Sequence, residues 1–550
     1  MTIKTTTPYL LAGLLLAPAV AFAQSQPTAG QLLQQTAPPP PPPSATAKET
    51  TVEEPTKQAA ASNEPITVRN VQITGNSAFS STTLSALIAG DIQPSMTLTD
   101  LDNLAARITR YYRNHGYLVA RAYLPPQDVS EGVVTIAILE GHLGEITLHD
   151  NTGTASTATA PLHRLQTGDA VNRQQMEDAL LRLSDLPGVE VKSTLRPGAS
   201  VGSSDFLVEL EPSAAFTGEV DVDNFGNRFV GAERIGASLY WNNPAKLGDQ
   251  LSLRAQANAS DFRYGRIGYQ LPIGPWATRI GVAWSAMRYK LGKAFDVLDA
   301  NGSASIGSFY VQQPLLRGRR ASWYVNAQFD DKHLHDDIGI VHLQSRKTLH
   351  NATLGIRGDI IDTLAGGASN RILLNYTQGR LGMDAVSAFI DQFTAHSSGQ
   401  FSKWSLDYQR LQRLPQNWLL TLNANAQWAD KNLDSSEKLL LGGSTGVRAY
   451  PQGEASGDNG YITSVELRHS VAERIDAFGF YDAGRVRINQ APWGPAASNH
   501  RRLAGYGVGL SYVFHPFSVQ VFAAWKAGTG EPESDEDKSP RLWAQAVYQF

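Results

Sequence analysis

The feature that most constrains this chain is a strict alternation of apolar and polar residues after about residue 212. Leu420 and Leu422, for example, alternate with Thr421 and Asn423. Successive side chains of a β-strand point to opposite faces, so each such segment predicts a strand with one apolar and one polar face. Counting the candidate strands gives about 16, an even number typical of single-chain outer-membrane barrels.

The connections between these segments favour a membrane barrel over a soluble sandwich. Short turns such as His515-Pro516 alternate with long connections such as Leu381–Ser398 and Val486–Arg502. Outer-membrane barrels have short periplasmic turns and longer extracellular loops. We therefore expect residues 213–550 to form an all-β transmembrane barrel of about 16 antiparallel strands, with the polar face lining an aqueous lumen.

The first residues predict export from the cytoplasm. Lys4 supplies a positive charge, Leu10–Val20 an apolar stretch, and Ala21-Phe22-Ala23 a small-residue cleavage site, so residues 1–23 are expected to be a signal peptide. Elsewhere no apolar stretch has the length that a membrane helix needs. The chain has no cysteine, which excludes disulfides and thiolate metal sites, and its net charge of −4 gives no nucleic-acid footprint.

Residues 24–65 have the composition of a linker. A proline run, Pro38–Pro43, stiffens the chain, and the residues after it include almost no large apolar side chain. Ala29–Gln35 could form two helical turns. This segment is either a short docking or plug helix or part of a disordered linker, and the sequence leaves both open.

Two small α/β modules are expected next, at residues 66–142 and 143–212. In the first, Ile66–Ile73 alternates as a strand, Thr97 with Asp100 caps a helix, and Gly116 ends that helix. Two further strands are expected in the first module, Leu118–Leu124 and Val133–Leu139. Three strands are expected in the second module, Glu145–His149, Val189–Leu195 and Phe206–Leu210.

Signals for catalysis are weak. Gly198–Gly202 matches a nucleophile-elbow pattern but lies between a proline and a strand, which predicts a hairpin loop. Gly505, Gly507 and Gly509 share one face of a strand, where they make room for something packed against the inner wall. No enzyme activity, metal or other cofactor is predicted. Arg317 lies at a short turn and is expected to face the periplasm and lipid headgroups.

The informative segment is a glycine-rich loop, residues 434–460, whose tip is Val447-Arg448-Ala449-Tyr450. Downstream, Phe480, Asp482 and Gly484 share one face of a strand. If that face lines the lumen, Asp482 needs a partner, and Arg448 is a suitable bidentate donor. The loop would then fold back into the barrel. The alternative is a mobile surface loop with Arg448 in solvent, and residue types alone do not decide between the two.

Several motifs, in order along the mature chain, resemble the TpsB transporters of two-partner secretion, the ShlB/FhaC/HecB haemolysin secretion/activation family. The loop tip is similar to the family's V-R-G-[YF] motif, and Phe480–Gly484 to its F-x-D-x-G motif. Ala449 stands where the family has glycine. The other matching segments are Val71–Asn76, Tyr117–Gln127, Leu139–Gly141, Asp223–Asn227 and Asn242–Pro244.

The resemblance implies two periplasmic POTRA domains in front of an outer-membrane barrel that secretes, and in some cases activates, a large TpsA-type exoprotein. Further implied partners are outer-membrane lipid, lipopolysaccharide and the barrel-assembly machinery. The alternatives are a BamA-like insertase and a passive channel. The cargo remains open among an adhesin, a cytolysin, a contact-dependent toxin and a haem scavenger.

Overall fold

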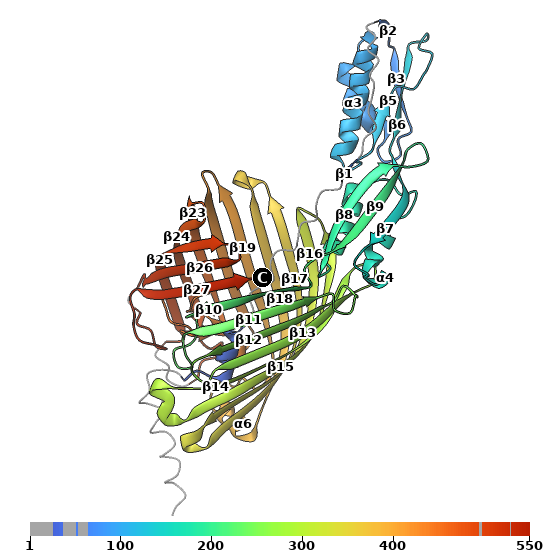
Figure 1. Cartoon of the computed structure of the whole chain (residues 1–550). Helices are drawn as coiled ribbons and strands as arrows, with labels where there is room; N and C mark the ends of the chain where they lie inside the picture. The colour runs from blue at the N-terminus through green and yellow to red at the C-terminus, as the bar shows by residue number, and fades with distance from the viewer. Residues whose placement is uncertain (1–25, 37–50, 53–63, 494–497, 529) are drawn as a thin grey trace, which may run out of the picture.

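The computed structural model describes residues 26–36, 51–52, 64–493, 498–528 and 530–550 (Figure 1). The expected signal peptide lies outside the described residues. A short helix and two α/β domains precede a large β-barrel (Figure 1). Among the residues described, no helix is both long enough and apolar enough to cross a membrane.

Sixteen antiparallel strands form the closed barrel, which confirms the expected fold class. The first and last strands close it through the register of Glu219–Asp223 with Gln545–Gln549. The strands are β10 (Phe216–Asp223), β11 (Arg234–Asn242), β12 (Gln250–Asn258), β13 (Arg263–Ile273), β14 (Thr278–Lys290), β15 (Ala300–Arg317), β16 (Ala321–Ile338), β17 (Leu343–Asp362), β18 (Ala368–Met383), β19 (Gly399–Leu414), β20 (Trp418–Ala429), β23 (Asn459–Ala472), β24 (Ile475–Arg487), β25 (His500–Phe514), β26 (Phe517–Lys526) and β27 (Arg541–Gln549).

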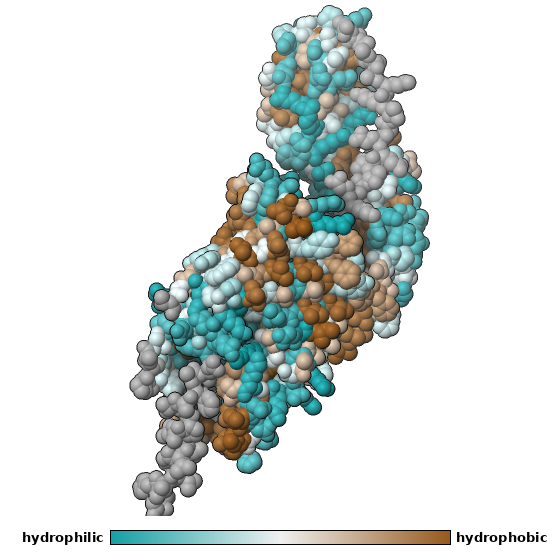
Figure 2. Space-filling model, turned by 60° about the vertical axis from the view of Figure 1, so that its left-hand side comes forward, coloured by the Kyte–Doolittle hydropathy of each residue, from teal (hydrophilic) through white to brown (hydrophobic). Residues whose placement is uncertain are grey.

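The outer face of the barrel carries the apolar half of the alternation. On β25, Tyr506, Val508 and Leu510 are exposed, whereas Gly505 and Gly507 point inward. Figure 2 shows hydrophobic residues gathered on this outer wall. A bilayer would cover these side chains, and closure of the sheet leaves no unpaired strand edge in the lipid.

The first α/β domain has a sheet in the order β3-β6-β5, packed on α3. The strand expected over Ile66–Ile73 is instead two strands, because Val68 and Arg69 donate their backbone N–H groups to Pro94 and Gly132 outside the sheet. The elements are β2 (Pro65–Thr67), β3 (Asn70–Thr74), α2 (Ser81–Ile88), the 3₁₀ turn η2 (Ala89–Asp91), β4 (Ser95–Thr97), α3 (Leu98–Asn114), β5 (Arg121–Tyr123) and β6 (Val133–Leu139).

The second α/β domain includes a strand from the linker. Thr51–Val52, β1, pairs in parallel with β8, which gives the sheet order β1-β8-β9-β7. The other elements are β7 (His142–Asp150), α4 (Ser156–Thr159), η3 (Ala160–Arg164), α5 (Arg173–Ser184), β8 (Val189–Pro197) and β9 (Ser203–Pro212). Gly198–Gly202 forms the loop between β8 and β9, so no helix follows the glycine-serine motif.

Buried arginines fix the second domain to the barrel. Arg182 of α5 is almost fully buried, pairs with Asp178, and donates to the carbonyls of Trp276 and Pro314 in the barrel. Arg317 is also buried and pairs with Asp185 of the domain, its Nε lying 2.9 Å from Oδ2. The expectation that Arg317 faces lipid headgroups was therefore wrong: its charge is neutralised within the interface.

Glu140, at the end of the first domain's sheet, is a local anchor. It accepts hydrogen bonds from the backbone N–H groups of Ser77 and Ala78, from the Ser77 hydroxyl and from Tyr112. Burial disfavours the charged carboxylate, but the hydrogen bonds from Ser77, Ala78 and Tyr112 outweigh it, so the pKa of Glu140 lies below its ordinary value.

We expect Glu140→Gln to lower the free energy of unfolding of the first domain by about 1–3 kcal/mol at pH 7. A lowered pKa contributes stability above the unfolded pKa of about 4.3, and that stability is lost as the pH falls through the folded pKa. Thermal unfolding at pH 7 and pH 3 measures the difference, with exposed Glu131→Gln as the control. An equal deficit at both pH values would contradict this role.

Candidate functional site

The loop between β20 and β23, called here the inner loop (residues 434–460), folds back into the barrel. It contains the 3₁₀ turn η7 (Ser435–Glu437) and a short ladder in which β21 (Leu439–Leu440) pairs with β22 (Ser456–Gly457). The four tip residues, Val447-Arg448-Ala449-Tyr450, are all buried, and Arg448 is only 8% exposed. The alternative of a mobile surface loop with Arg448 in solvent does not describe this conformation.

Arg448 and Asp482 form a bidentate ion pair between the loop tip and β24. The guanidinium Nε and Nη2 donate to the two carboxylate oxygens at 2.9 Å each, and the backbone N–H of Arg448 adds a third bond at 3.1 Å. Asp482 is fully buried. Planar, two-point pairing of this kind fixes orientation as well as charge.

The pair belongs to a larger polar cluster on the inner wall. Arg448 Nη1 donates to Glu466 Oε2 at 2.8 Å, and Ser464 accepts from Nη2 and donates to Asp482. The guanidinium also lies over the Phe480 ring, 3.4 Å from its centroid, a cation–π geometry. Removing Arg448 would leave the buried Asp482 carboxylate without its cationic partner, which is strongly destabilising. We call the Arg448–Asp482 ion pair the clasp.

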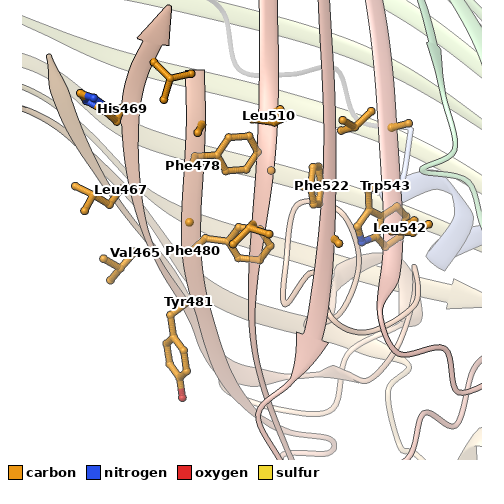
Figure 3. A pocket seen from close by; sticks show the side chains of 18 of the residues that line it. Val465, Leu467, His469, Phe478, Phe480, Tyr481, Leu510, Phe522, Leu542 and Trp543 are labelled. Carbon is orange, nitrogen blue, oxygen red and sulfur yellow. The ribbon is translucent and has the colours of Figure 1, made fainter. Parts of the chain in front are cut away.

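Glycines of β25 make the close fit of the tip possible. A Cβ at Gly505 would contact the Ala449 Cβ, one at Gly507 would contact the Phe480 ring, and one at Gly509 the Phe478 ring. Figure 3 shows Phe478 and Phe480 on one side of β24 and Tyr481 on the other. Phe480 therefore shares the inner face with Asp482 and Gly484, whose own added Cβ would contact Leu441 of the inner loop.

Ala449 is not strained at its position. It does not have the positive φ that would favour glycine, and its methyl group occupies the room left by the missing side chain of Gly505. The departure from the family's glycine therefore leaves the tip in contact with the wall.

A second set of ion pairs holds the base of the inner loop. Glu437 lies 2.7 Å from Lys332 and 2.9 Å from Lys403, and Asp434 lies 2.8 Å from Lys347. These lysines project from β16, β17 and β19, whereas the tip is held by β23 and β24. The inner loop thus spans the lumen from one stretch of wall to another.

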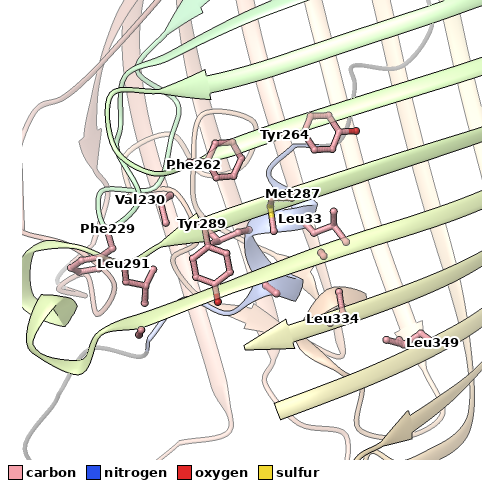
Figure 4. Close-up of a cluster of buried hydrophobic side chains, with 14 of the residues drawn as sticks. Leu33, Phe229, Val230, Phe262, Tyr264, Met287, Tyr289, Leu291, Leu334 and Leu349 are labelled. Atoms are coloured by element: carbon pink, nitrogen blue, oxygen red, sulfur yellow. The ribbon is translucent and has the colours of Figure 1, made fainter. Parts of the chain in front are cut away.

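Helix α1 (Ala29–Gln34) occupies the lumen beside the base of the inner loop (Figure 4). Ala29, Leu32 and Leu33 are buried against inward-facing side chains that include Met287 and Tyr289. Polar contacts also tie the helix to the loop: Thr28 Oγ1 lies 2.9 Å from Ser435 Oγ, and Gln34 donates to the Lys438 carbonyl. At the N-terminus of the helix, the backbone N–H of Ala29 donates a hydrogen bond to Asp336 Oδ1 on β16.

Sequence reasoning brought together Arg448 and Asp482 but missed the other charged members of the site. Glu466, Lys332, Lys403 and Lys347 occupy inward-facing strand positions, where polar residues are ordinary in an aqueous lumen. Glu466 and Lys332 each have a second charged residue two positions away, Arg468 and Asp330, but Lys347 and Lys403 have none. Within the described ranges, no group of His, Cys, Asp and Glu is arranged to hold a metal ion.

A closed barrel of 16 strands, preceded in the chain by small α/β domains, is the architecture of a class of outer-membrane transporters. The family described as haemolysin secretion/activation protein ShlB/FhaC/HecB matches residues 202–512, and the ShlB-type POTRA domain matches residues 66–141. The chain belongs to this family of TpsB transporters, located in the outer membrane with periplasmic POTRA domains, and the family implies a secretion role with a TpsA-type partner.

Individual relatives cover most of the chain. The heme/hemopexin transporter protein HuxB of Haemophilus influenzae (strain 86-028NP) is 29% identical over 78% of this chain and 77% of its own length. The outer membrane transporter CdiB of Dickeya dadantii (strain 3937) is 24% identical over 84% of this chain and 82% of its own. The solved structure of CdiB from Escherichia coli has the same fold, with a TM-score of 0.71, 21% identity and coverage of 90% and 93% of the two chains.

We expect Gly505→Val to displace the loop tip, because the added side chain would strike Ala449, an overpacking that costs about 1–3 kcal/mol. Since the chain has no cysteine, a single Val447→Cys substitution reports tip exposure by thiol labelling. Labelling should accelerate by about tenfold in the Gly505→Val background. The control is Gly265→Val, where an added Cβ meets open space. Equal labelling rates in the Gly505→Val and Gly265→Val backgrounds would contradict the close packing of the loop tip against Gly505.

Proposed function

We propose that this transporter recognises a large partner exoprotein in the periplasm and secretes it, unfolded, through the barrel lumen. The observation that carries this proposal is the clasp between Arg448 and Asp482, which holds an inner loop across the lumen of a barrel wide enough to conduct a chain. A purely structural barrel needs no such loop. Charged contacts that are strong when buried and replaceable by water when exposed suit a reversible closure.

A groove between the two periplasmic domains is the proposed capture site. It has a volume of about 610 Å³ and is bordered by the edge strand β5 on one side and the β8–β9 loop on the other. Leu118 and Val119 of the first domain and Leu195 and Val201 of the second line it. Strand addition at such an edge gives affinity through backbone bonds, and the mixed apolar and polar lining of the groove gives side-chain selectivity.

The edge of β8 is a further position for strand addition, but the linker occupies it. Thr51 and Val52 pair there with Thr194 and Leu195. An incoming strand at this edge would have to replace the linker, which also leads to α1 in the lumen. Capture and the release of α1 would then be linked through one stretch of chain.

Export requires that both α1 and the inner loop leave their places. The helix and the loop base contact each other and fill the same part of the lumen. The periplasm supplies no ATP, so folding of the exoprotein outside the cell is the proposed source of directionality. An exoprotein variant that cannot fold but is exported at the full rate would contradict that part of the proposal.

Arg448→Ala should reduce export about tenfold or more while leaving barrel assembly intact, because Asp482 would lose its buried partner. The assay measures release of a TpsA-type exoprotein produced in the same cells, with heat-modifiable gel mobility as the measure of assembly. Arg485→Ala is the matched control, since this arginine lies on the outer face of the same strand. Normal export by the Arg448→Ala variant would contradict the proposed role of the Arg448–Asp482 ion pair in export.

Leu32→Ser with Leu33→Ser should release α1, because each buried leucine contributes about 1.5–3 kcal/mol of apolar burial. We expect a higher ion conductance in planar bilayers than for the unchanged chain. Leu364→Ser, at an exposed turn next to the periplasm, is the control. Equal conductance would mean that the helix does not limit the resting pore.

Two alternatives are less well supported. A BamA-like insertase shares the barrel, as the BamA structure from Haemophilus ducreyi does with a TM-score of 0.52 at 13% identity, but that likeness concerns the fold alone. A passive channel gives no reason for the periplasmic groove. We further propose contacts with outer-membrane lipid, lipopolysaccharide and the barrel-assembly machinery, and no enzymatic role. The likeness to HuxB, a heme/hemopexin transporter protein, makes a cargo connected with heme or hemopexin the first one to test.

A further inference from the structure

The extracellular connection between β18 and β19 carries a helix with an uncovered apolar stripe. In α6 (Ala385–Gln392) and the residue after it, four large apolar side chains recur at spacings of three and four residues on the exposed face. Phe393 is 70% exposed and Phe389 63%, and their rings contact each other edge to face. The four residues, called here the exit stripe, are Val386, Phe389, Ile390 and Phe393.

Hydrogen bonds anchor the helix at both ends. Asp384 caps it, accepting from the backbone N–H groups of Val386 and Ser387 and from the N–H of Arg346 on β17. Near the other end, the buried Asp391 accepts from Ser397 and Ser398. The stripe is therefore presented in a fixed conformation, which lowers the entropy lost when a partner binds.

The membrane is not the partner that this position fits. We take the outward-facing aromatic pair Tyr376 and Trp404 to mark the outer interface, because barrel strands carry aromatic girdles at the interfaces. Asp384 is eight residues beyond Tyr376, about 26 Å along the strand and about 20 Å above that level for a tilted strand. Polar, exposed side chains, among them Gln378 and Arg380, separate the two. An interfacial helix would instead lie at the depth of the headgroups.

Helix α6 contacts the lumen-facing side of the extracellular end of β17. Ser387 Oγ lies 3.0 Å from Ser345 Oγ, and Ser345 shares the inward face of β17 with Lys347 and Leu349. On the adjacent hairpin tip, Ile340 and Val341 are also exposed. Figure 2 shows hydrophobic atoms at this end of the molecule, opposite the N-terminal domains.

We propose that the exit stripe binds apolar side chains of the exported polypeptide as it emerges from the lumen, before it folds. This inference rests on the proposed export function. An anchored apolar surface at the rim can contact an unfolded chain without sequence specificity, and two exposed phenylalanines supply a large apolar area for such contacts. Holding the emerging segment outside disfavours its return into the pore.

The test uses the full chain, assembled in cells that also produce a TpsA-type exoprotein that it exports. Phe389→Ser with Phe393→Ser should lower the rate of release about fivefold, with barrel assembly unchanged. Val297→Ser, an equally exposed apolar residue on another extracellular tip, should release cargo at the normal rate. A photo-crosslinking residue at position 393 should capture the exported protein during transit.

The outcomes separate the two proposals. If the unchanged transporter releases no TpsA-type exoprotein, the export function fails and this inference fails with it. If export is normal in the double Phe variant, or position 393 crosslinks to lipid or to a second copy of this chain instead of the exported protein, the exit stripe proposal is overturned while the exporter stands.

Discussion

Every other feature of this molecule depends on closing a sheet in lipid. A spanning sheet must pair each backbone N–H and C=O group, and the pairing of β10 with β27 completes that requirement. Closure also assigns the two faces of every strand, because the apolar face must meet the bilayer. Ionisable residues such as Asp482 and Lys332 are thereby directed into the lumen, where their charges need partners.

Those inward charges explain how the lumen can be filled without being sealed permanently. The inner loop is held at its tip by Arg448 and at its base by Glu437 and Asp434, mostly through ion pairs. Such contacts are strong while water is excluded and weaken when water enters. Helix α1 adds an apolar contribution through Leu32 and Leu33. The interior therefore combines charged and apolar contacts on two segments that touch each other.

The barrel strands could be predicted from the sequence because they depend on periodicity, and the Arg448–Asp482 ion pair because its two residues stand out by charge. Alternation identified the barrel strands, and the lone arginine of the inner loop matched Asp482, an inward-facing aspartate of β24. The sequence could not predict Arg317 in the domain interface, since the partner Asp185 is distant along the chain. The break within Ile66–Ile73 depends on carbonyls from elsewhere in the domain. The domain boundaries at residues 65, 142 and 212, and the signal peptide, stay predictions.

The barrel wall is uneven in height. β10 has 8 residues and β27 has 9, whereas β15 and β16 have 18 each and β17 has 20. About 9–11 residues suffice to cross a membrane, so the long strands continue well beyond it while those at the seam barely reach across. The rim of the barrel is therefore higher along β15, β16 and β17 than at the seam between β10 and β27. Under the proposed export function, the lumen would open sideways over the seam and not only along the barrel axis.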